Sequence, residues 1–237
     1  MAGRADPEWI RACWVRPDAV LLGAGDAMIA AAAGRLRLET PSGEYDPEQH
    51  FLLGLLAGRP WFTEIGGEGL EPLREVMDGL AGHELEAAFT AAGLVGWHLR
   101  ARFCPTCGSP TVAAAGGAAR QCRGCGVEHY PRTDPAVIVA IVDDSDRLLL
   151  GRQSSWPPGR HSVFAGFAET GESLEQAVRR EMAEEVGLEL DRVGYLGSQP
   201  WPFPRSLMVA FIAHARDTEL HLDSFEIERA RWFTRPE

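Results

Sequence analysis

The sequence contains no lysine and no asparagine, so all 23 of its basic residues are arginine. The absence of lysine excludes Schiff-base chemistry and lysine anchors for phosphate, and the absence of asparagine excludes N-glycosylation. Positive charge is scarce overall, because 34 acidic residues leave a net charge of -11 and a pI near 5.1. This balance argues against a strongly basic nucleic-acid surface or an anionic-membrane binder. An anionic substrate would need positive charge supplied locally.

Long apolar runs are missing too. No stretch approaches the roughly 20 residues that span a bilayer, and the opening MAGRADPEWIRACW lacks the continuous apolar core of a secretory signal. We therefore expect a cytoplasmic protein that has no membrane partner. With 237 residues and 45% hydrophobic content, the chain can form one large domain or two to three smaller ones with ordinary cores.

Cysteine is scarce but ordered. Four of the five cysteines form two C-x2-C pairs separated by fourteen residues, Cys104 with Cys107 and Cys122 with Cys125, and glycine follows each pair. Glycine permits a tight turn that aims backbone amides at the thiolates. This spacing predicts one tetrahedral, structural zinc site in a ribbon over residues 99–130. An iron site, redox dithiols and a pair of disulfides remain as alternatives.

The rest of the chain divides around this ribbon. Residues 1–98 contain alternating apolar segments and a helical pattern over residues 73–92 but no catalytic cluster, and we expect an N-terminal α+β domain there. Within the ribbon, residues 112–119 (VAAAGGAA) indicate a soft loop. Residues 131–237 open with the buried-strand run AVIVAIV, the turn DDSD and a second strand RLLLG, which begin a further domain.

A helix is predicted over residues 174–186, within the segment GFAETGESLEQAVRREMAEEVGL. Ser173 and Gln176 form a capping-box pattern at its start, apolar residues recur at helical spacing, and Gly187 ends it. Glu181 and Glu185 are four residues apart, so they share one face of this helix.

Carboxylates are dense around this helix. Glu184 lies one step round from the shared face, and Glu172 enters from the loop at the positive N-terminal end. Hard divalent cations such as magnesium or manganese prefer oxygen ligands of this kind. Arg180 can hold one carboxylate in place through a forked hydrogen bond. The alternative interpretation is an ordinary solvated helix face.

Taken together, residues 166–188 resemble the Nudix box, G-x5-E-x7-R-E-U-x-E-E-x-G-U with U apolar, and they match it at every specified position. Nudix hydrolases cleave a nucleoside diphosphate linked to another moiety. The resemblance implies a Nudix-type α/β/α sandwich with a mixed sheet over residues 131–237. It also implies magnesium or manganese ions, roughly two to three, that neutralise a pyrophosphate.

The same resemblance implies metal ligands. Glu181 and Glu185 would be the principal ones, joined by the backbone carbonyl of Ala165. Glu226, in the stretch FEIERARWF, matches a family position that completes the metal site from outside the box. Its alternative interpretation is a surface glutamate.

Supporting roles follow as well. Glu184 is a further candidate ligand, whereas Glu172 and Arg180 would mainly organise the site. A carboxylate can also take the proton of the attacking water. The sequence does not decide which glutamate is that base.

A second motif narrows the family. Residues 198–206 read SQPWPFPRS, in which three prolines indicate a stiff loop and two aromatic residues offer flat surfaces for bases; a packed Pro/aromatic loop is the alternative. This motif, together with a four-cysteine ribbon, resembles the NADH pyrophosphatase branch of the Nudix family. That branch hydrolyses NAD(H) to AMP and nicotinamide mononucleotide, usually as a homodimer. The resemblance implies substrate-binding residues at Arg74, Tyr130, Phe167, Gln199, Pro200, Trp201, Pro202, Phe203, Pro204, Arg205 and Ser206.

Some of these positions have simpler interpretations. Tyr130 is equally well a core or interface tyrosine, and Arg74 a surface arginine. Two departures from the branch also stand out, since its members usually continue past the WF pair whereas this sequence ends at Glu237, and lysine is absent. We expect both departures to affect substrate preference more than reaction type.

Three functions compete at this point. The leading one is a metal-dependent NAD(H) diphosphatase. The second is removal of NAD caps from RNA 5′ ends, which requires a basic track; the arginines near the ribbon are the candidates for it, at positions Arg100, Arg102, Arg120, Arg123 and Arg132. The third is a non-catalytic module that binds nucleotides or a protein, which the intact glutamates disfavour.

Overall fold

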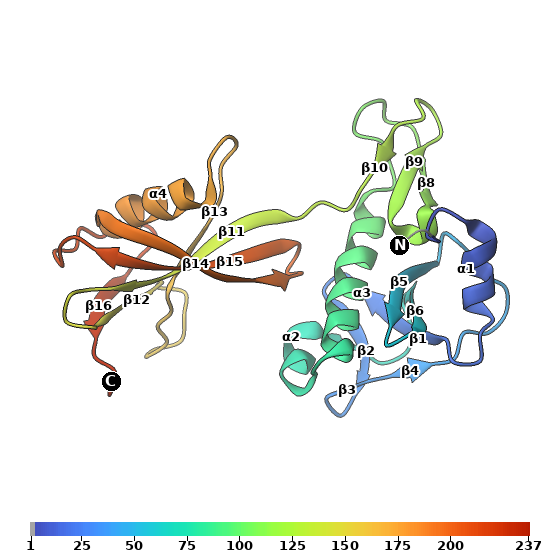
Figure 1. Cartoon of the computed structure of the whole chain (residues 1–237), viewed down its shortest axis with the longest axis horizontal. Coiled ribbons are helices and arrows are strands. Elements are labelled where there is room, and N and C mark those ends of the chain that lie inside the picture. Colours follow the sequence, from blue (N-terminus) through green and yellow to red (C-terminus); the bar gives the residue numbers. More distant parts are fainter. Residues whose placement is uncertain (1–2) are drawn as a thin grey trace. The chain divides into compact units, whose positions relative to one another are not determined.

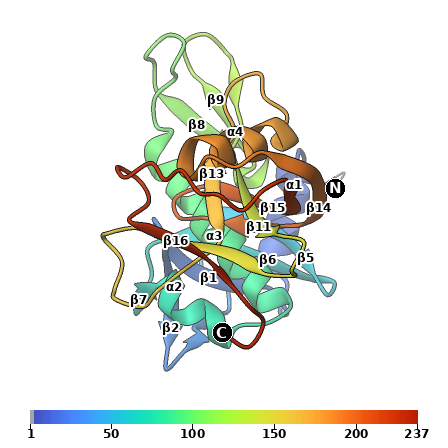
Figure 2. The ribbon, with the colours of Figure 1, turned by 90° about the vertical axis from the view of Figure 1, so that its left-hand side faces the viewer.

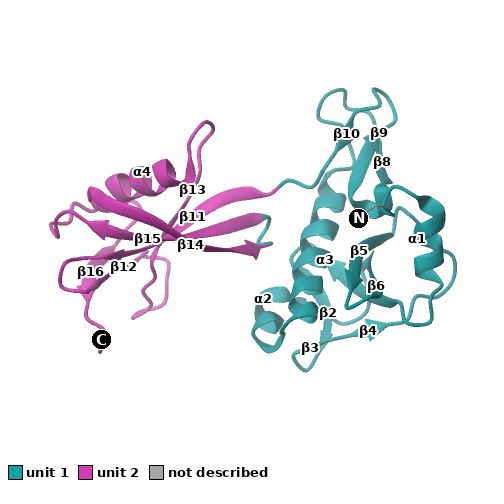
Figure 3. Ribbon diagram, in the orientation of Figure 1, with its two compact units in different colours: residues 1–132, 202–205 teal, residues 133–201, 206–237 magenta. Residues whose placement is uncertain are grey.

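The computed structural model describes residues 3–237, which separate into two compact units (Figure 3). Unit 1 comprises the residues up to 132 together with 202–205, and unit 2 comprises residues 133–201 with 206–237. Each unit has a hydrophobic core of its own. Across residues 3–237, none of the helices combines the length and the apolar character that a membrane crossing requires.

The first part of unit 1 is built on a seven-stranded sheet (Figure 1). Strands β1 and β6 are parallel, and the other pairs are antiparallel. Strand β4 pairs with β1, and β7 pairs with β2. The main path runs through β3 (Arg35–Leu36), β2 (Met28–Ala32), β1 (Val20–Gly25), β6 (Arg59–Ile65) and β5 (His50–Leu56), with β4 (Leu38–Glu39) and β7 (Leu70–Pro72) beside it.

Two helices, α1 (Pro7–Trp14) and α3 (His83–Arg100), cover the two faces of this sheet. Successive side chains of a strand point to opposite faces. Leu21 therefore joins the cluster around α1, whereas its neighbour Leu22 joins the cluster under α3. The buried face of helix α3 is rich in alanine. The predicted α+β character of this region is confirmed.

The predicted helix over residues 73–92 is partly wrong. The structure has a short helix α2 (Leu73–Val76), then a 3₁₀ turn over Met77–Gly79, and α3 begins only at His83. Gly82 interrupts the helical path with a φ of 54°, a left-handed value that suits glycine. The apolar spacing across the break is real, but it belongs to two elements that both face the same core.

The ribbon also belongs to unit 1 and has three antiparallel strands, β8 (Thr111–Ala114), β9 (Ala119–Cys122) and β10 (Glu128–His129). The prediction of a soft loop over residues 112–119 is wrong. Half of this segment is strand, and its 3₁₀ turn Ala115–Gly117 packs tightly. A Cβ added to Gly117 would lie 2.6 Å from the Phe51 side chain, so glycine is needed there for close packing on β5.

Unit 2 contains a mixed six-stranded sheet. Strands β11 and β15 are parallel over nine residue pairs, and the remaining pairs are antiparallel. Strand β13 (Phe164–Phe167) pairs with β11 off the main path. That path is β14 (Leu190–Trp201), β15 (Ser206–Ala215), β11 (Asp134–Val142), β12 (Leu148–Arg152) and β16 (Arg229–Phe233). The predicted mixed sheet and its first two strands are confirmed.

One helix, α4 (Leu174–Val186), packs on a face of this sheet over β11, β13 and β14 (Figures 1 and 2). Its predicted bounds are confirmed, and so are its caps: the Ser173 side chain accepts from Gln176 N while the Gln176 side chain accepts from Ser173 N. Gly187 ends the helix at a φ of 70°. Helix α4 is the single helix in the part of unit 2 that the structure describes.

Candidate functional site

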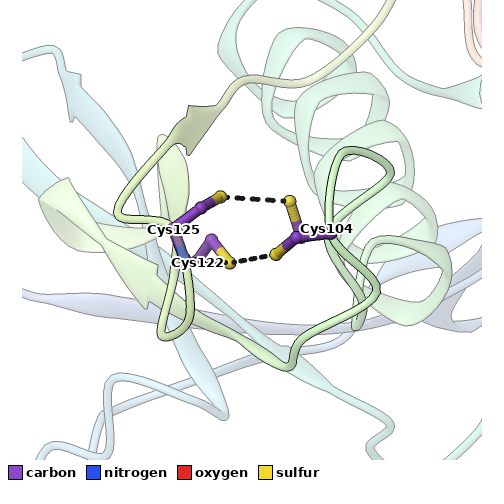
Figure 4. A group of neighbouring side chains, drawn as sticks. Cys104, Cys122 and Cys125 are labelled. Carbon is purple, nitrogen blue, oxygen red and sulfur yellow. Dashed lines mark hydrogen bonds between the residues drawn. The ribbon is translucent and has the colours of Figure 1, made fainter.

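The four ribbon cysteines converge on one point (Figure 4). Their sulfur atoms all lie within 4.8 Å of one another, with Cys104 and Cys125 3.7 Å apart and Cys107 and Cys122 3.4 Å apart. Four thiolates bound to one tetrahedral zinc at about 2.3 Å would be spaced by about 3.8 Å. The cysteines therefore fit a closed zinc site with no position left for a substrate.

Local backbone geometry produces this convergence. Each pair uses the same turn, in which the glycine four residues after the first cysteine donates to that cysteine's carbonyl; Gly108 donates to Cys104 and Gly126 to Cys122. Both glycines have left-handed φ values, 72° and 74°. Amides within the turn face the sulfur atoms, as Gly124 N does toward Cys122 Sγ at 3.3 Å. The glycine after each pair was the sequence signal for these turns.

A histidine that the sequence analysis missed lies beside the cysteines. His129 Nε2 is 3.2 Å from Cys104 Sγ. Burial opposes ionisation of Cys104, but the amides of Cys107 and Thr106 together with His129 lower the pKa of its thiol. Cys104 is thus prepared as a thiolate ligand, and His129 is an outer partner that orients it.

One of the five arginines named as candidates for a basic track near the ribbon is not available for it. Arg120 is buried, and its guanidinium contacts His98 Nδ1 at 2.9 Å and Glu48 Oε2 at 3.1 Å. It also donates to the Thr111 hydroxyl and carbonyl. Because His98 Nδ1 accepts from Arg120 while Nε2 donates to Gly117 O, the ring is a neutral tautomer, and burial lowers the pKa of His98 to about 4. This buried network joins the ribbon to α3 and to the segment before β5.

In unit 2, the carboxylates of the box surround one arginine. Arg180 binds Glu172 with a fork, its Nε 2.7 Å from Oε1 and its Nη2 3.0 Å from Oε2. Its Nη1 lies 2.9 Å from Glu181 and 3.0 Å from Glu184, and Nη2 donates to the carbonyl of Phe167. Arg180 lowers the pKa of Glu172, so this carboxyl stays ionised. Arg180 therefore connects α4 to the strand and loop before it.

Gly166 shows why one box position admits no side chain. A Cβ placed there would lie 1.9 Å from the carboxyl carbon of Glu181. The bare strand lets this carboxylate lie directly against β13, beside Ala165. Burial, opposed by Arg180, raises the pKa of Glu181.

Glu185 faces the interior and is only 7% exposed. Burial, followed by the charges of Glu181 and Glu226, raises its pKa to about 7. Asp223 N donates to the carbonyl of Glu185 and so brings the segment that carries Glu226 next to α4. A buried carboxyl near other carboxyls favours a cation.

The box and zinc sites differ in how closely their ligands gather. Within residues 3–237, the cysteines are the one group of three or more histidine, cysteine or acidic side chains whose ligand atoms lie within 4.8 Å of one another. Glu181, Glu185 and Glu226 do not form such a group, because Glu181 turns to Arg180 and Glu226 is exposed. The donors fit divalent ions by type, but their oxygen atoms do not converge on one point in this structure.

Two cavities of unit 2 adjoin this region, and Ile138 lines both. The smaller, about 180 Å³, includes Ala165 and Glu185 in its wall together with Arg152, Trp156 and Ile227. The larger, about 560 Å³, is mainly apolar and is lined by Ser198, Gln199, Trp201, Leu196, Met208 and Ala210. The sequence analysis missed Arg152, although a charge at the end of the apolar strand RLLLG was a usable signal.

The predicted substrate motif is divided between the units. The loop predicted over residues 198–206 is confirmed only for residues 202–205, because residues 198–201 lie on strand β14 and Ser206 lies on β15. Pro202 to Arg205 form the turn, which belongs to unit 1, and Ser206 starts β15 as a buried residue.

The remaining candidate residues lie in unit 1, apart from Phe167. Arg74 lies over the ring of Phe203, 4.5 Å from its centroid. Tyr130 is 59% exposed, donates to Glu128, and lines a cavity of about 230 Å³ with Trp97, Phe103, His129, Arg132 and Arg205. Phe167, in unit 2, is 57% exposed and stands next to Gly166.

Comparison with known proteins agrees with this architecture. Residues 132–237 match a NUDIX domain model, and residues 99–130 match an NADH pyrophosphatase zinc ribbon domain model. The NAD-capped RNA hydrolase NudC of Stutzerimonas stutzeri is 40% identical over 203 residues, which cover 83% of this chain and 72% of that protein. The chain belongs to the Nudix hydrolase family. Its ribbon and its NudC relatives assign it to the NADH pyrophosphatase branch.

Other relatives match over less of their length. NudC from Mycobacterium bovis BCG Pasteur is 50% identical over 149 residues, 62% of this chain and 48% of that protein. The human NAD-capped RNA hydrolase NUDT12 is 46% identical over 154 residues, 61% of this chain and 33% of that protein. This chain thus spans between a third and a half of these two relatives.

Proposed function

We propose that this protein hydrolyses the pyrophosphate bond of NAD(H) and yields AMP and nicotinamide mononucleotide. The observation that carries the proposal is a pair of cavities in unit 2 that share Ile138 in their walls. One has the buried Glu185 and Ala165 in its wall, and the other has the Gln199 and Trp201 side chains of the substrate motif. A dinucleotide needs one place for its diphosphate and another for a base, and this arrangement offers both.

The chain's own residues would divide the work. Glu181, Glu185, the Ala165 carbonyl and Glu226 would hold magnesium or manganese ions, with Glu184 as a further ligand. Such ions, when bound, activate water and neutralise phosphoryl charge. Arg180 and Glu172 keep α4 and the loop before it in register, as their forked contact indicates.

Recognition would come from flat side chains and from the substrate motif. Trp201 and Phe167 present aromatic surfaces to a base, and Gln199 offers an amide for hydrogen bonding. Tyr130, Arg74 and the turn from Pro202 to Arg205, with Ser206 after it, complete the proposed substrate-binding set. The proposal includes three domains, 1–98, 99–130 and 131–237, and a homodimer in the cytoplasm.

Removal of NAD caps from RNA is the second candidate function. The names of the NudC and NUDT12 relatives carry it, and one surface favours it here. Phe103 and Tyr130 are 66% and 59% exposed, and they line one cavity with Arg132 and Arg205. Exposed aromatic residues among arginines suit single-stranded nucleic acid.

One assay tests the proposal. The protein is incubated with NADH, NAD and ADP-ribose in turn, with magnesium or manganese, and the products are separated by chromatography. AMP together with reduced nicotinamide mononucleotide from NADH is the expected result, and a chelator should stop its formation. An NAD-capped RNA is tested in the same way: inactivity on the three compounds and on this RNA would leave a non-catalytic binding module, and cleavage of the RNA alone would favour the second candidate.

A further inference from the structure

Arg152 is a charged residue that the proposed function leaves unused. It is the last residue of β12, its side chain is 14% exposed, and it lines the same 180 Å³ cavity as Ala165 and Glu185. It is the one basic residue in the wall of that cavity, all of which the structure describes. A guanidinium is seldom buried without partners that compensate its desolvation. The hydrogen bonds of the Arg152 guanidinium therefore show which of its donors the protein itself satisfies.

Two contacts fix the plane of the guanidinium. Arg152 Nη1 lies 2.9 Å from the carboxylate of Glu228, and Nη2 donates to the carbonyl of Trp156 at 2.7 Å. Glu228 N in turn donates to the carbonyl of Arg152. Arg152 is thus anchored both to the loop after β12 and to the segment that carries Glu226 and Ile227.

The third nitrogen is left over. Arg152 Nε is buried and has no hydrogen-bond partner among the described residues. A buried donor without a partner destabilises a protein by about 1–3 kcal/mol, so such donors are usually completed by water or by a ligand. In the wall of this cavity Glu185 is the one acidic residue, which can attract a cation, and Arg152 is the group that attracts an anion.

We infer that Arg152 is a further substrate-contacting residue, whose Nε–H donates to a non-bridging oxygen of the diphosphate; this inference rests on the proposed function. Arginine suits this position because its planar donors match phosphate oxygens and its charge does not titrate. The contact strengthens as negative charge develops on the transferred phosphoryl group. Arg152 forms no covalent bond and stays protonated throughout.

The test compares R152A with the wild type and with R192A, a matched control at an arginine whose side chain is 78% exposed. R152A should lower kcat/KM for NADH by about a hundredfold, the loss expected for one removed charge-stabilising donor, and R192A should leave it unchanged. Guanidinium ion added to R152A should restore at least a tenth of the lost rate, and urea, which is neutral and similar in shape, should not. A merely structural arginine would show no such selective rescue.

R152K covers the case in which R152A fails to fold, because lysine keeps the charge but lacks the Nε donor. We expect R152K to unfold at the wild-type temperature and still to lose at least about tenfold in kcat/KM. Wild-type kcat/KM in R152K, or in a folded R152A, would overturn the inference.

A binding measurement separates this inference from the proposed function. Calorimetry with methylenediphosphonate and magnesium should give a Kd at least tenfold weaker for R152A than for the wild type. If the wild type cleaves NADH, and R152A binds the probe and cleaves NADH equally well, the inference on Arg152 fails while the proposed function stands. If the wild type cleaves no dinucleotide but R152A still loses affinity, the proposed function fails and the diphosphate contact stands. If the wild type neither binds the probe nor cleaves a dinucleotide, both fail.

Discussion

The zinc ribbon of unit 1 and the acidic site of unit 2 hold their candidate metal ligands in different ways. The cysteines gather within 4.8 Å because two short turns, each with its own glycine, aim them at one point. The glutamates come from a loop, a helix and a distant segment, and one arginine binds three of them. In a structural metal site the protein fills every coordination position, whereas a catalytic metal keeps positions open for water and substrate.

The largest effect should come from removing one of the four cysteine ligands of the zinc site. C122S removes one thiolate from a buried position, and we expect the protein to lose its zinc and the ribbon to unfold, because structural zinc supplies folding free energy directly. Zinc content by atomic spectroscopy and unfolding by circular dichroism measure this. Full zinc and an unchanged unfolding temperature would contradict the assignment of the ribbon as a structural site.

A substitution in the acidic site should lower the activity without unfolding the protein. E185Q keeps the shape of the side chain but removes a charged ligand, so turnover of NADH should fall by at least about a hundredfold while the unfolding temperature stays level or rises. E189Q, at an exposed carboxylate beyond the box, is the matched control. An E185Q enzyme with nearly normal turnover would remove Glu185 from the metal site.

A substitution in the buried network around Arg120 should destabilise the protein by an intermediate amount. R120M keeps much of the side-chain volume but leaves Glu48 and the Thr111 carbonyl without their partner. Loss of one member of such a buried contact costs about 3–5 kcal/mol, less here because Glu48 is partly exposed. We expect about 2–3 kcal/mol of destabilisation in urea unfolding. The R123M variant, at an exposed arginine, should be neutral.

The stability of the two units should also change with pH in opposite directions. The folded-state pKa of His98 is lowered to about 4, so its contribution to stability is present above the unfolded pKa of 6.5 and is lost as pH falls toward 4. The folded-state pKa of Glu185 is raised to about 7, so its contribution is present below the unfolded value of 4.5 and is lost as pH rises through 7.

Hydrogen exchange at pH 5 and pH 8, on protein that keeps its zinc but is freed of magnesium and manganese, resolves the two effects. Amides of α3 should be better protected at pH 8, and amides of α4 at pH 5, each by about 1–2 kcal/mol after allowance for solvent screening. H98Q and E185Q should each abolish the pH dependence of their own unit. Parallel pH dependence in both units would contradict this prediction.

The sequence predicted what short-range rules govern. The capping box at Ser173, the stop at Gly187 and the cysteine turns each depend on residues within a few positions, and the structure confirms them. It did not predict that Arg120 is buried, because the partners His98 and Glu48 lie 22 and 72 positions away. The orphaned Nε of Arg152 was equally invisible, since only the folded loops around β12 define it.

The packing of Gly117 on Phe51 limits how the chain can be dissected. A peptide cut at residues 99 and 130 would keep all four cysteines, yet it would leave this glycine turn exposed and Arg120 without Glu48. Metal binding is sufficient to fold an isolated zinc finger, but this ribbon also packs against strand β5 through Gly117 and Phe51. Any autonomous fragment that carries the metal must therefore start upstream of that strand.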